Sequence, residues 1–372
     1  PEWQESGRAL DLTTVEDADF KEIVNTIPDS MKLSMDGKAS YGIPFNVEGY
    51  GYLVDSGMLS DLFGEDRVKD LLSDLKACSY EEFTAFCVAV DEYIASPASS
   101  SVKVNGNSYS FHTQKTGRAA NLTGVFAFAG SEKWTYGDHL INIAINAVFP
   151  DARSAENATE EQLDQLKQPF VAYAQALEFV YYLKKYNYDG GHASRGSELI
   201  NKANFGYDQS VQMYADGNAL FLQQGNWAYA NIEKVNADVA ARSSFIPIKL
   251  PLTDAMIQTG KTAAQMNASI PVYVPNYYAI NAKASETAQK QAIQFLTWMQ
   301  KPENIQKYII DSFEALPYNA NDSMQIENPL SVSILEYMKN GNTLSAPYHG
   351  APNIWTSEVV GKELMEKYLV KQ

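Results

Sequence analysis

The chain has 372 residues, of which 45% are hydrophobic and 20% charged, and its formal net charge is −16. This length and composition fit an ordinary globular protein with enough core for two domains. The negative charge argues against nucleic acid, anionic lipid surfaces and polyanionic ligands as partners, because the long-range field repels them. The longest apolar runs fall short of the roughly 20 residues that a membrane-spanning helix needs. The first residues, PEWQESG, lack the pattern of an export signal, so we expect any such signal to lie outside this sequence.

Two early segments have strand patterns. Residues 38–55 are rich in strand formers, and the interruption Gly42-Ile43-Pro44 predicts a change of direction or of domain within them. Residues 101–113 alternate around Asn105-Gly106, which predicts a small hairpin.

Ser79 and Glu82 have the spacing of a capping box and predict a helix over 80–95. The two cysteines, Cys78 and Cys87, flank the start of this helix. Nine residues of helix separate their backbones by about 12 Å, beyond disulfide reach. We therefore expect both to be reduced, with Cys87 in the core.

The rest of the chain is mostly helical in pattern. Short buried strands are expected at 243–251 and 272–282. Helices are expected at 138–148, from 159 to a Tyr-Asp-Gly-Gly stop at 188–191, after Asp208 and on to Leu220 and Phe221, after Ser285 with a break near Pro302, and at 353–370.

Motifs for catalysis or metal binding do not stand out. The histidines have no metal-ligand spacing, so we expect neither a metal nor a cofactor; they are His112, His139, His192 and His349. The sequence has no phosphate loop, no nucleophile elbow and no calcium loop. The many acidic residues leave a hydrolase-like carboxylate pair open, although no pair is singled out.

Aromatic residues are abundant: 23 Tyr, 16 Phe and 5 Trp. Tyrosine and tryptophan combine a flat apolar face with a polar atom, which suits the C–H-rich faces and hydroxyl edges of a sugar ring. Trp298 lies on an apolar helix flank and is expected to pack in the core. Trp227 follows a Gln-Gln-Gly-Asn segment and fits either a folded-back core residue or a ligand platform. The other tryptophans beside polar or turn residues, and so also ligand candidates, are Trp3, Trp134 and Trp355.

Four segments, in order along the chain, form a recognisable set: DGKASYGIPFNVEGYGYLVDSGMLSDL, CSYEEF, YADGNALFLQQGNWAYANI and VPNYYAINAKASETAQKQAIQFLTWMQKPENIQKYI. Together they resemble the maltose-binding-protein-like family of extracellular solute-binding proteins of sugar ABC importers. The sequence departs from the pattern at Leu53-Val54-Asp55, where the family has Tyr-Asn-Lys. It also begins where the family already has about 60 residues behind it, so we expect the first strands of the pattern and its earliest ligand loop to be missing from this sequence.

The resemblance implies a set of ligand-binding residues. The tryptophan of the family's Gly-x-Trp turn stacks on sugar and matches Trp227, with Asn226 beside it. Glu48 falls where a carboxylate meets sugar hydroxyls, with Tyr50 further along the same strand. Trp355 matches a stacking aromatic near the start of a late helix, Trp134 and Tyr136 lie in the loop that supplies another, and Trp3 stays a candidate from the aromatic pattern.

The resemblance also implies an α/β fold of the type II periplasmic-binding-protein class, with two lobes around a ligand cleft and crossing hinge strands. Residues 1–46 and 275–312 would form lobe I, and residues 47–274 and 313–372 lobe II. The implied function is capture of a neutral di- or oligosaccharide by lobe closure and its delivery to permease subunits of an ABC importer, without catalysis.

The implied protein is a monomer, either lipid-anchored to the outside of the cytoplasmic membrane through a segment beyond this sequence or free in the periplasm. Two alternatives stay open: a binding protein for a polyamine or other small cation, which the acidic charge suits, and a carbohydrate-active hydrolase.

Overall fold

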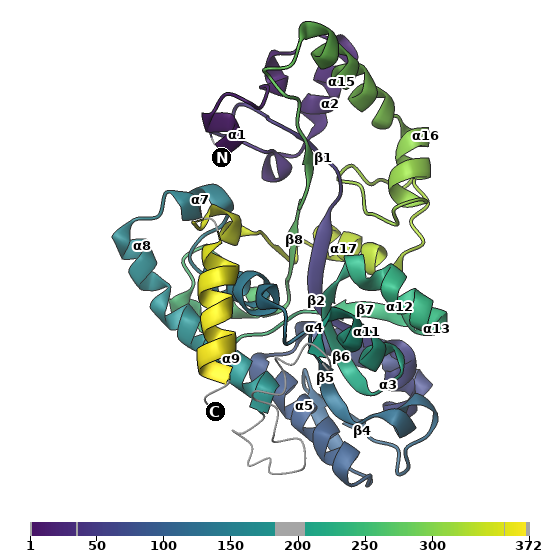
Figure 1. The fold of residues 1–372 in the computed structure, drawn as a ribbon. Coiled ribbons are helices and arrows are strands. Elements are labelled where there is room, and N and C mark those ends of the chain that lie inside the picture. Colours follow the sequence, from purple (N-terminus) through teal and green to yellow (C-terminus); the bar gives the residue numbers. More distant parts are fainter. Residues whose placement is uncertain (1, 35, 183–204, 353, 370–372) are drawn as a thin grey trace. The chain divides into compact units, whose positions relative to one another are not determined.

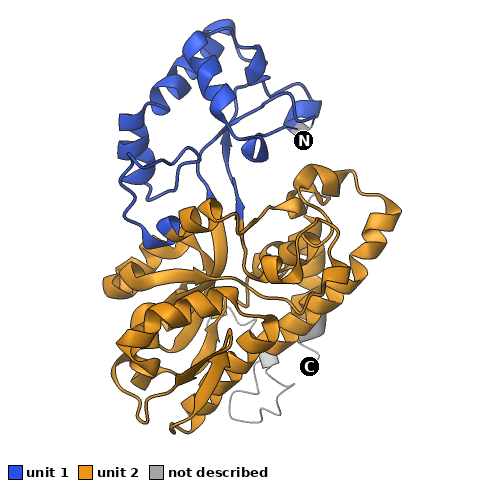
Figure 2. Ribbon diagram, turned by 180° about the vertical axis from the view of Figure 1, so that it is seen from behind, with its two compact units in different colours: residues 1–48, 272–332 blue, residues 49–271, 333–372 orange. Residues whose placement is uncertain are grey.

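The chain divides into two compact units (Figure 2). A computed structural model describes residues 2–34, 36–182, 205–352 and 354–369. Unit 1 comprises residues 1–48 and 272–332, and unit 2 comprises residues 49–271 and 333–372. The chain passes between the units three times, within strand β2 (Glu48–Asp55), within strand β8 (Ile270–Tyr273) and within helix α17 (Pro329–Lys339).

The third crossing lies later in the chain than the expected lobe boundary. Residues 313–332 belong to unit 1, whereas we expected them in the second lobe. The reason is local packing: the Val47 amide donates to the Leu316 carbonyl (2.7 Å), and Met324 and Ile326 pack against a buried cluster of Ile305, Ile309 and Ile310. Such non-local contacts leave little trace in a single sequence.

Unit 1 consists mainly of helices. Strands β1 (Ile43–Pro44) and β9 (Tyr277–Tyr278) form an antiparallel pair. The strand pattern of residues 38–55 is divided between β1 and β2, and the chain changes unit between Glu48 and Gly49, which confirms the predicted change of domain within this segment. The helical elements are α1 (Glu2–Glu5), η1 (Leu12–Thr14), α2 (Ala18–Thr26), η2 (Asp29–Met31), α15 (Glu286–Met299), α16 (Pro302–Asn304) and η10 (Ile305–Ile310).

Helix α15 begins as predicted, because the Ser285 side chain accepts a hydrogen bond from the Ala288 amide, and it ends before Pro302. The expected core position of Trp298 is wrong. Its side chain is 39% exposed and contacts Phe295 and Tyr308, so it lies on the surface of unit 1.

Unit 2 is built around a six-stranded sheet of order β10-β8-β2-β6-β5, with β7 also paired to β2. Strands β6 and β7 are antiparallel to β2, and β5 is parallel to β6. The remaining strands of this sheet are β5 (Gly124–Ala127), β6 (Ala219–Gly225), β7 (Ser243–Ile246) and β10 (Thr343–Leu344).

Strand β6 corrects the helix expected up to Phe221. The helix α11 (Tyr207–Ala215) ends early, Gly217 takes a positive φ of 82°, and the seven residues of β6, from Ala219 to Gly225, are all buried in the sheet. The two glutamines Gln223 and Gln224 are therefore strand residues and not part of a turn. Sheet pairing decides the conformation of this segment, whose apolar run alone fits helix or strand.

Helices cover the sheet of unit 2 (Figure 1). Helix α5 (Tyr80–Ala95) contacts β5, and α11 contacts β6. The other helical elements are α3 (Ser56–Phe63), η3 (Glu65–Arg67), α4 (Val68–Ala77), η4 (Gly117–Asn121), η5 (Thr135–Leu140), α6 (Ile141–Ile145), α7 (Ala152–Glu156), α8 (Glu160–Gln165), α9 (Lys167–Tyr182), η8 (Asn226–Ala228), α12 (Tyr229–Val235), α13 (Ala237–Arg242), η9 (Asp254–Met256), α14 (Ala263–Asn267), η11 (Pro347–Gly350), η12 (Trp355–Gly361) and η13 (Leu364–Leu369).

Several local predictions in unit 2 are confirmed. The capping box of Ser79 and Glu82 opens α5, and both cysteines are buried and free. Strands β3 (Ser101–Val104) and β4 (Asn107–Ser110) form the expected hairpin, with Asn105 and Gly106 at positive φ. The predicted helix stop at 188–191 lies outside the described residues. In the described part of the chain, the helices are too short or too polar to span a membrane.

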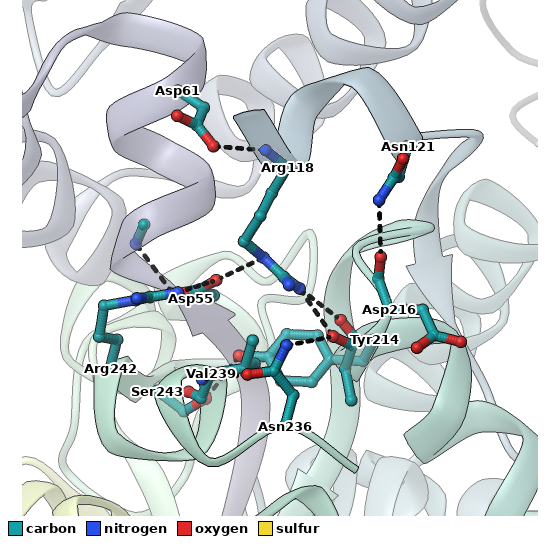
Figure 3. A network of polar contacts seen from close by, with 12 residues as sticks. Asp55, Asp61, Arg118, Asn121, Tyr214, Asp216, Asn236, Val239, Arg242 and Ser243 are labelled. Atoms are coloured by element: carbon teal, nitrogen blue, oxygen red, sulfur yellow. Dashed lines mark hydrogen bonds and ion pairs between the residues drawn. The ribbon is translucent and has the colours of Figure 1, made fainter. Parts of the chain in front are cut away.

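An ion-pair network around a buried carboxylate joins five elements of unit 2 (Figure 3). The side chain of Asp55 is only 2% exposed, and its two oxygens lie 2.9 Å from the Nε atoms of Arg118 and Arg242. It also accepts a hydrogen bond from the Gly57 amide and so caps α3. Arg118 donates in turn to the carbonyls of Tyr214 and Ala215 at the end of α11. The network fixes β2, α3, η4, α11 and the end of α13 to one another.

Candidate ligand-binding site

Trp227 lies in a short helical turn directly after the central strand β6. Its ring covers Gly225 so closely that a Cβ there would lie 2.0 Å from the indole Cζ3 atom. Its Nε1 donates to the side-chain oxygen of Gln224 (2.9 Å). Gly225 and Gln224 together set the orientation of the Trp227 indole. The Trp227 side chain is partly exposed, so part of its surface is open to a ligand.

Asn226 is buried and connects this turn to β2. Its side-chain oxygen accepts a hydrogen bond from the Gly49 amide (3.2 Å). Asn226 therefore supports the turn that carries Trp227 by linking it to β2.

Trp134 lies immediately before η5, a segment of π-helix, and is partly exposed. The imidazole of His139, within η5, contacts both candidate tryptophans. The ring centroids of His139 and Trp134 are 4.8 Å apart with an interplanar angle of 64°, and those of His139 and Trp227 are 5.2 Å apart at 47°. Two tryptophans far apart in sequence are thus brought together. We call Trp134, His139 and Trp227 the aromatic cluster.

Tyr50 and Tyr136 are buried below the surface. The Tyr50 ring stacks on His139 (4.1 Å, 14°) and its hydroxyl donates to the His139 carbonyl (2.7 Å). The Tyr136 hydroxyl donates to the Gly130 carbonyl. Burial raises the pKa of Tyr50 well above its ordinary value, so the phenol stays neutral. Neither ring presents a face to solvent, in contrast to their expected contact with a ligand.

Trp355 starts η12, which packs on η5. The approach is so close that a Cβ on Gly137 would lie 1.8 Å from the Thr356 carbonyl oxygen. The Thr356 hydroxyl donates to Asp138, and Lys133 pairs with Glu358 (2.7 Å). Burial raises the pKa of Asp138, opposed by this hydrogen bond. These contacts fix the helix that begins with the partly exposed Trp355 to the segment that carries Trp134 and His139.

Glu48 belongs to unit 1 and is half-buried. Its two carboxylate oxygens accept hydrogen bonds from the side chains of Asn46 (3.1 Å) and Tyr273 (3.4 Å). Burial is the largest influence on its pKa and raises it, whereas the two hydrogen bonds act in the opposite direction. The carboxylate is therefore held in place by neutral donors and has no cation in hydrogen-bond contact among the described residues.

Trp3, in the short helix α1, also belongs to unit 1. Its side chain is 55% exposed, and its carbonyl accepts hydrogen bonds from the Arg8 and Ala9 amides. The aromatic cluster lies in unit 2, so the structure does not group Trp3 with it.

The sequence did not single out His139, Gln224 or Asp138. His139 lies five residues after Trp134, but a histidine without metal-ligand spacing gave no reason to select it. Its ring is the contact shared by Trp134, Trp227 and Tyr50. Among the described residues, no group of three or more His, Cys, Asp or Glu side chains is placed to hold a metal ion.

The site in unit 2 thus offers flat apolar faces with polar atoms at their edges, on a two-unit α/β framework. The sequence matches the family model of bacterial extracellular solute-binding proteins over residues 2–327. The chain belongs to that family, which confirms the resemblance. No curated protein sequence matches the chain.

Solved structures similar to this chain support the same fold. One is the solute-binding protein RafE in complex with raffinose, with a TM-score of 0.59 and 14% identity over 100% of this chain and 79% of that one. A Streptococcus pneumoniae solute-binding protein in complex with the blood group A-trisaccharide has a TM-score of 0.55 and 15% identity over 100% and 77%. The maltose/maltodextrin-binding domain MalE from Bdellovibrio bacteriovorus bound to maltotriose has a TM-score of 0.52 and 15% identity over 99% and 75%. The fold is that of the type II periplasmic-binding-protein class.

Proposed function

We propose that this solute-binding protein captures a neutral di- or oligosaccharide, with Trp134, Trp227 and Trp355 as stacking surfaces. The observation that carries the proposal is that Trp134 and Trp227 meet on one imidazole ring and are both partly exposed. Sugar faces pack on such rings, and sugar hydroxyls take hydrogen bonds at their edges. In this proposal Tyr50, Tyr136 and Asn226 support the site from below.

Three further parts of the proposal come from the family. Glu48 would accept hydrogen bonds from sugar hydroxyls, and the two units would close on the ligand about the three chain crossings. The partner would be the permease of an ABC importer. This protein would be a monomer that meets the permease on the outer side of the cytoplasmic membrane, where it is either lipid-anchored or free in the periplasm. Capture would break no bond.

The ligand class has support from similar structures whose ligands are raffinose, the blood group A-trisaccharide and maltotriose. A further similar structure holds a single sugar, α-D-tagatose. A micromolar sugar complex corresponds to about −8 kcal/mol, which a few stacked rings and hydrogen bonds supply after the costs of closure.

A small organic cation is the second candidate, because the net charge of −16 attracts cations and an aromatic face can hold an ammonium group. A thermal-shift screen separates the candidates. It would include neutral oligosaccharides, polyamines and acidic sugars, because a ligand that binds the folded protein raises its melting temperature further as the ligand concentration increases. Stabilisation by polyamines alone would replace the sugar proposal, and release of shorter sugars on prolonged incubation would indicate a hydrolase.

Calorimetry on two variants then tests the assigned residues. We expect Trp227→Ala to lose about 1–3 kcal/mol of affinity for the best sugar of the screen. Glu48→Gln should also weaken binding, because a charge-assisted hydrogen bond becomes a neutral one. Trp298→Ala, which removes a partly exposed tryptophan of unit 1, is the matched control and should bind like the parent. Unchanged affinity in Trp227→Ala would remove Trp227 from the site.

A further inference from the structure

We infer that His139 is a positioning residue, whose ring sets the spacing and tilt of Trp134 and Trp227 and thereby the sugar affinity of the site. This inference rests on the proposed function. It adds to it a residue that itself need not touch the ligand.

The first argument is geometric. The His139 ring is stacked on Tyr50 (4.1 Å, 14°) and also contacts Trp134 (4.8 Å) and Trp227 (5.2 Å). These three neighbours come from β2, from the residue before η5 and from the turn after β6. One ring therefore mediates between three segments that are distant in sequence, and a change in its size would be felt by both tryptophans.

The second argument is that the imidazole cannot leave this position easily. His139 is only 6% exposed, and Tyr50 fastens it from below, since the Tyr50 hydroxyl donates to the His139 carbonyl. Asn142 donates to the same hydroxyl (3.2 Å) and to the Ser345 carbonyl (2.9 Å). The backbone of His139 and the ring below it are thus both fixed, which is what holding a stacking surface in one orientation requires.

The third argument concerns charge. Burial lowers the pKa of His139 to about 3, so its ring is neutral at ordinary pH. The titratable groups around it include Tyr50, whose ring stacks on it, and Asp138, the residue before it in η5; Tyr348 and Asp138 both act electrostatically on Tyr50. Among the described residues, the Nδ1 atom of His139 has no hydrogen-bond partner. A neutral ring whose Nδ1 atom makes no hydrogen bond acts on Trp134 and Trp227 through its shape.

Substitutions at His139 separate shape from polarity. His139→Phe keeps an aromatic ring and loses both nitrogens, His139→Asn keeps a polar group and loses the ring, and His139→Ala loses both. With raffinose and maltotriose as probes, we expect His139→Phe to stay within about threefold of the parent affinity, whereas His139→Ala and His139→Asn should each lose about tenfold. Loss in His139→Phe with retention in His139→Asn would overturn the inference in favour of a polar role.

Two readouts exclude a merely structural role. Acrylamide quenching and the emission maximum of tryptophan in the ligand-free protein should change in His139→Ala and not in His139→Phe, because only the former releases Trp134 and Trp227. The pH profiles of probe affinity for parent and His139→Phe should superimpose between pH 5 and 8, since the parent ring stays neutral there; a divergence centred near 6.5 would contradict the inference.

The two proposals fail in different ways. If the parent binds no sugar of the screen, the proposed function fails, while ligand-free quenching still tests the positioning of the tryptophans. If the parent binds sugar and His139→Ala binds it equally well with unchanged quenching, the positioning role alone is wrong.

Discussion

At the level of single residues, Asp55 is a charged group that the fold of unit 2 removes from water. Its carboxylate is almost fully buried, caps α3 and meets two guanidinium groups at 2.9 Å. The hydrogen bond from Arg242 to this carboxylate is the largest cause of the raised pKa of that guanidinium. The two arginines compensate for the removal of the carboxylate from water.

Neutralising this carboxylate should therefore destabilise the protein strongly. In Asp55→Asn the half-buried Arg118 and the more exposed Arg242 lose their counter-charge. Breaking a fully buried pair costs about 3–5 kcal/mol, and we expect a loss at or below the lower end of this range because water screens the Arg242 side chain. Urea unfolding of the isolated variant measures this loss. Asp29→Asn is the control, because Asp29 pairs with Lys32 on the surface of unit 1 and that pair should be worth little. An Asp55→Asn variant as stable as the parent would show that the network adds nothing to stability.

The residue scale also marks the limit of sequence reasoning. Trp227 and Trp134 could be selected from their polar neighbours, and both are partly exposed. The same reasoning selected Tyr50 and Tyr136, which are buried, and passed over His139 and Asp55. What distinguishes these residues is which side chains from other elements surround them, and a single sequence does not contain that information.

At the level of elements, local signals with their own chemistry were sufficient. The capping box at Ser79, the turn at Asn105-Gly106 and the break near Pro302 each depend only on the chemistry of neighbouring residues. The elements that they predict are confirmed. Strand β6 was mistaken for helix because its conformation depends on pairing with β2 and β5. Tertiary contacts override local preference in such segments.

The contact between η5 and η12 gives a prediction at this scale. Gly137 lets the Thr356 carbonyl approach to a distance that no side chain tolerates, since an added Cβ would lie 1.8 Å from that oxygen. Gly137→Ala should therefore displace η12 and lower the melting temperature. Because Trp355 begins η12, sugar affinity should fall as well.

Gly106→Ala provides the matched comparison. Its added Cβ would meet no atom within 4 Å, so it carries only the cost of a positive φ, about 1 kcal/mol. Circular dichroism melts and calorimetry on both variants are the measurements. If the two variants have equal melting temperatures and equal sugar affinity, η12 accommodates the added Cβ without any effect on the site, and the prediction is wrong.

At the level of the whole molecule, the family and fold could be predicted because four ordered motifs span most of the chain, and the family match over residues 2–327 confirms them. The division into units was harder. Two of the three crossings lie within three residues of the expected boundaries, whereas the third lies inside α17, beyond 313–332. The packing of Met324 and Ile326 on the isoleucine cluster decides that placement.

The number of tryptophans in the proposed site makes a prediction about ligand length. Trp134 and Trp227 share one imidazole, while Trp355 belongs to a different helix packed on η5. A monosaccharide has two faces and could use two rings at most, so a third ring is useful only to a longer ligand.

We therefore expect affinity for a homologous series of one to five neutral sugar units to rise by about tenfold (1.4 kcal/mol) from one unit to two or three, and then to level off. Trp355→Ala should remove much of the increase in affinity that longer sugars show over the shortest sugar that binds. The affinity for that shortest sugar should stay nearly unchanged. Competition titrations at fixed ionic strength measure both effects, and tightest binding by the monosaccharide would refute the assignment of an oligosaccharide.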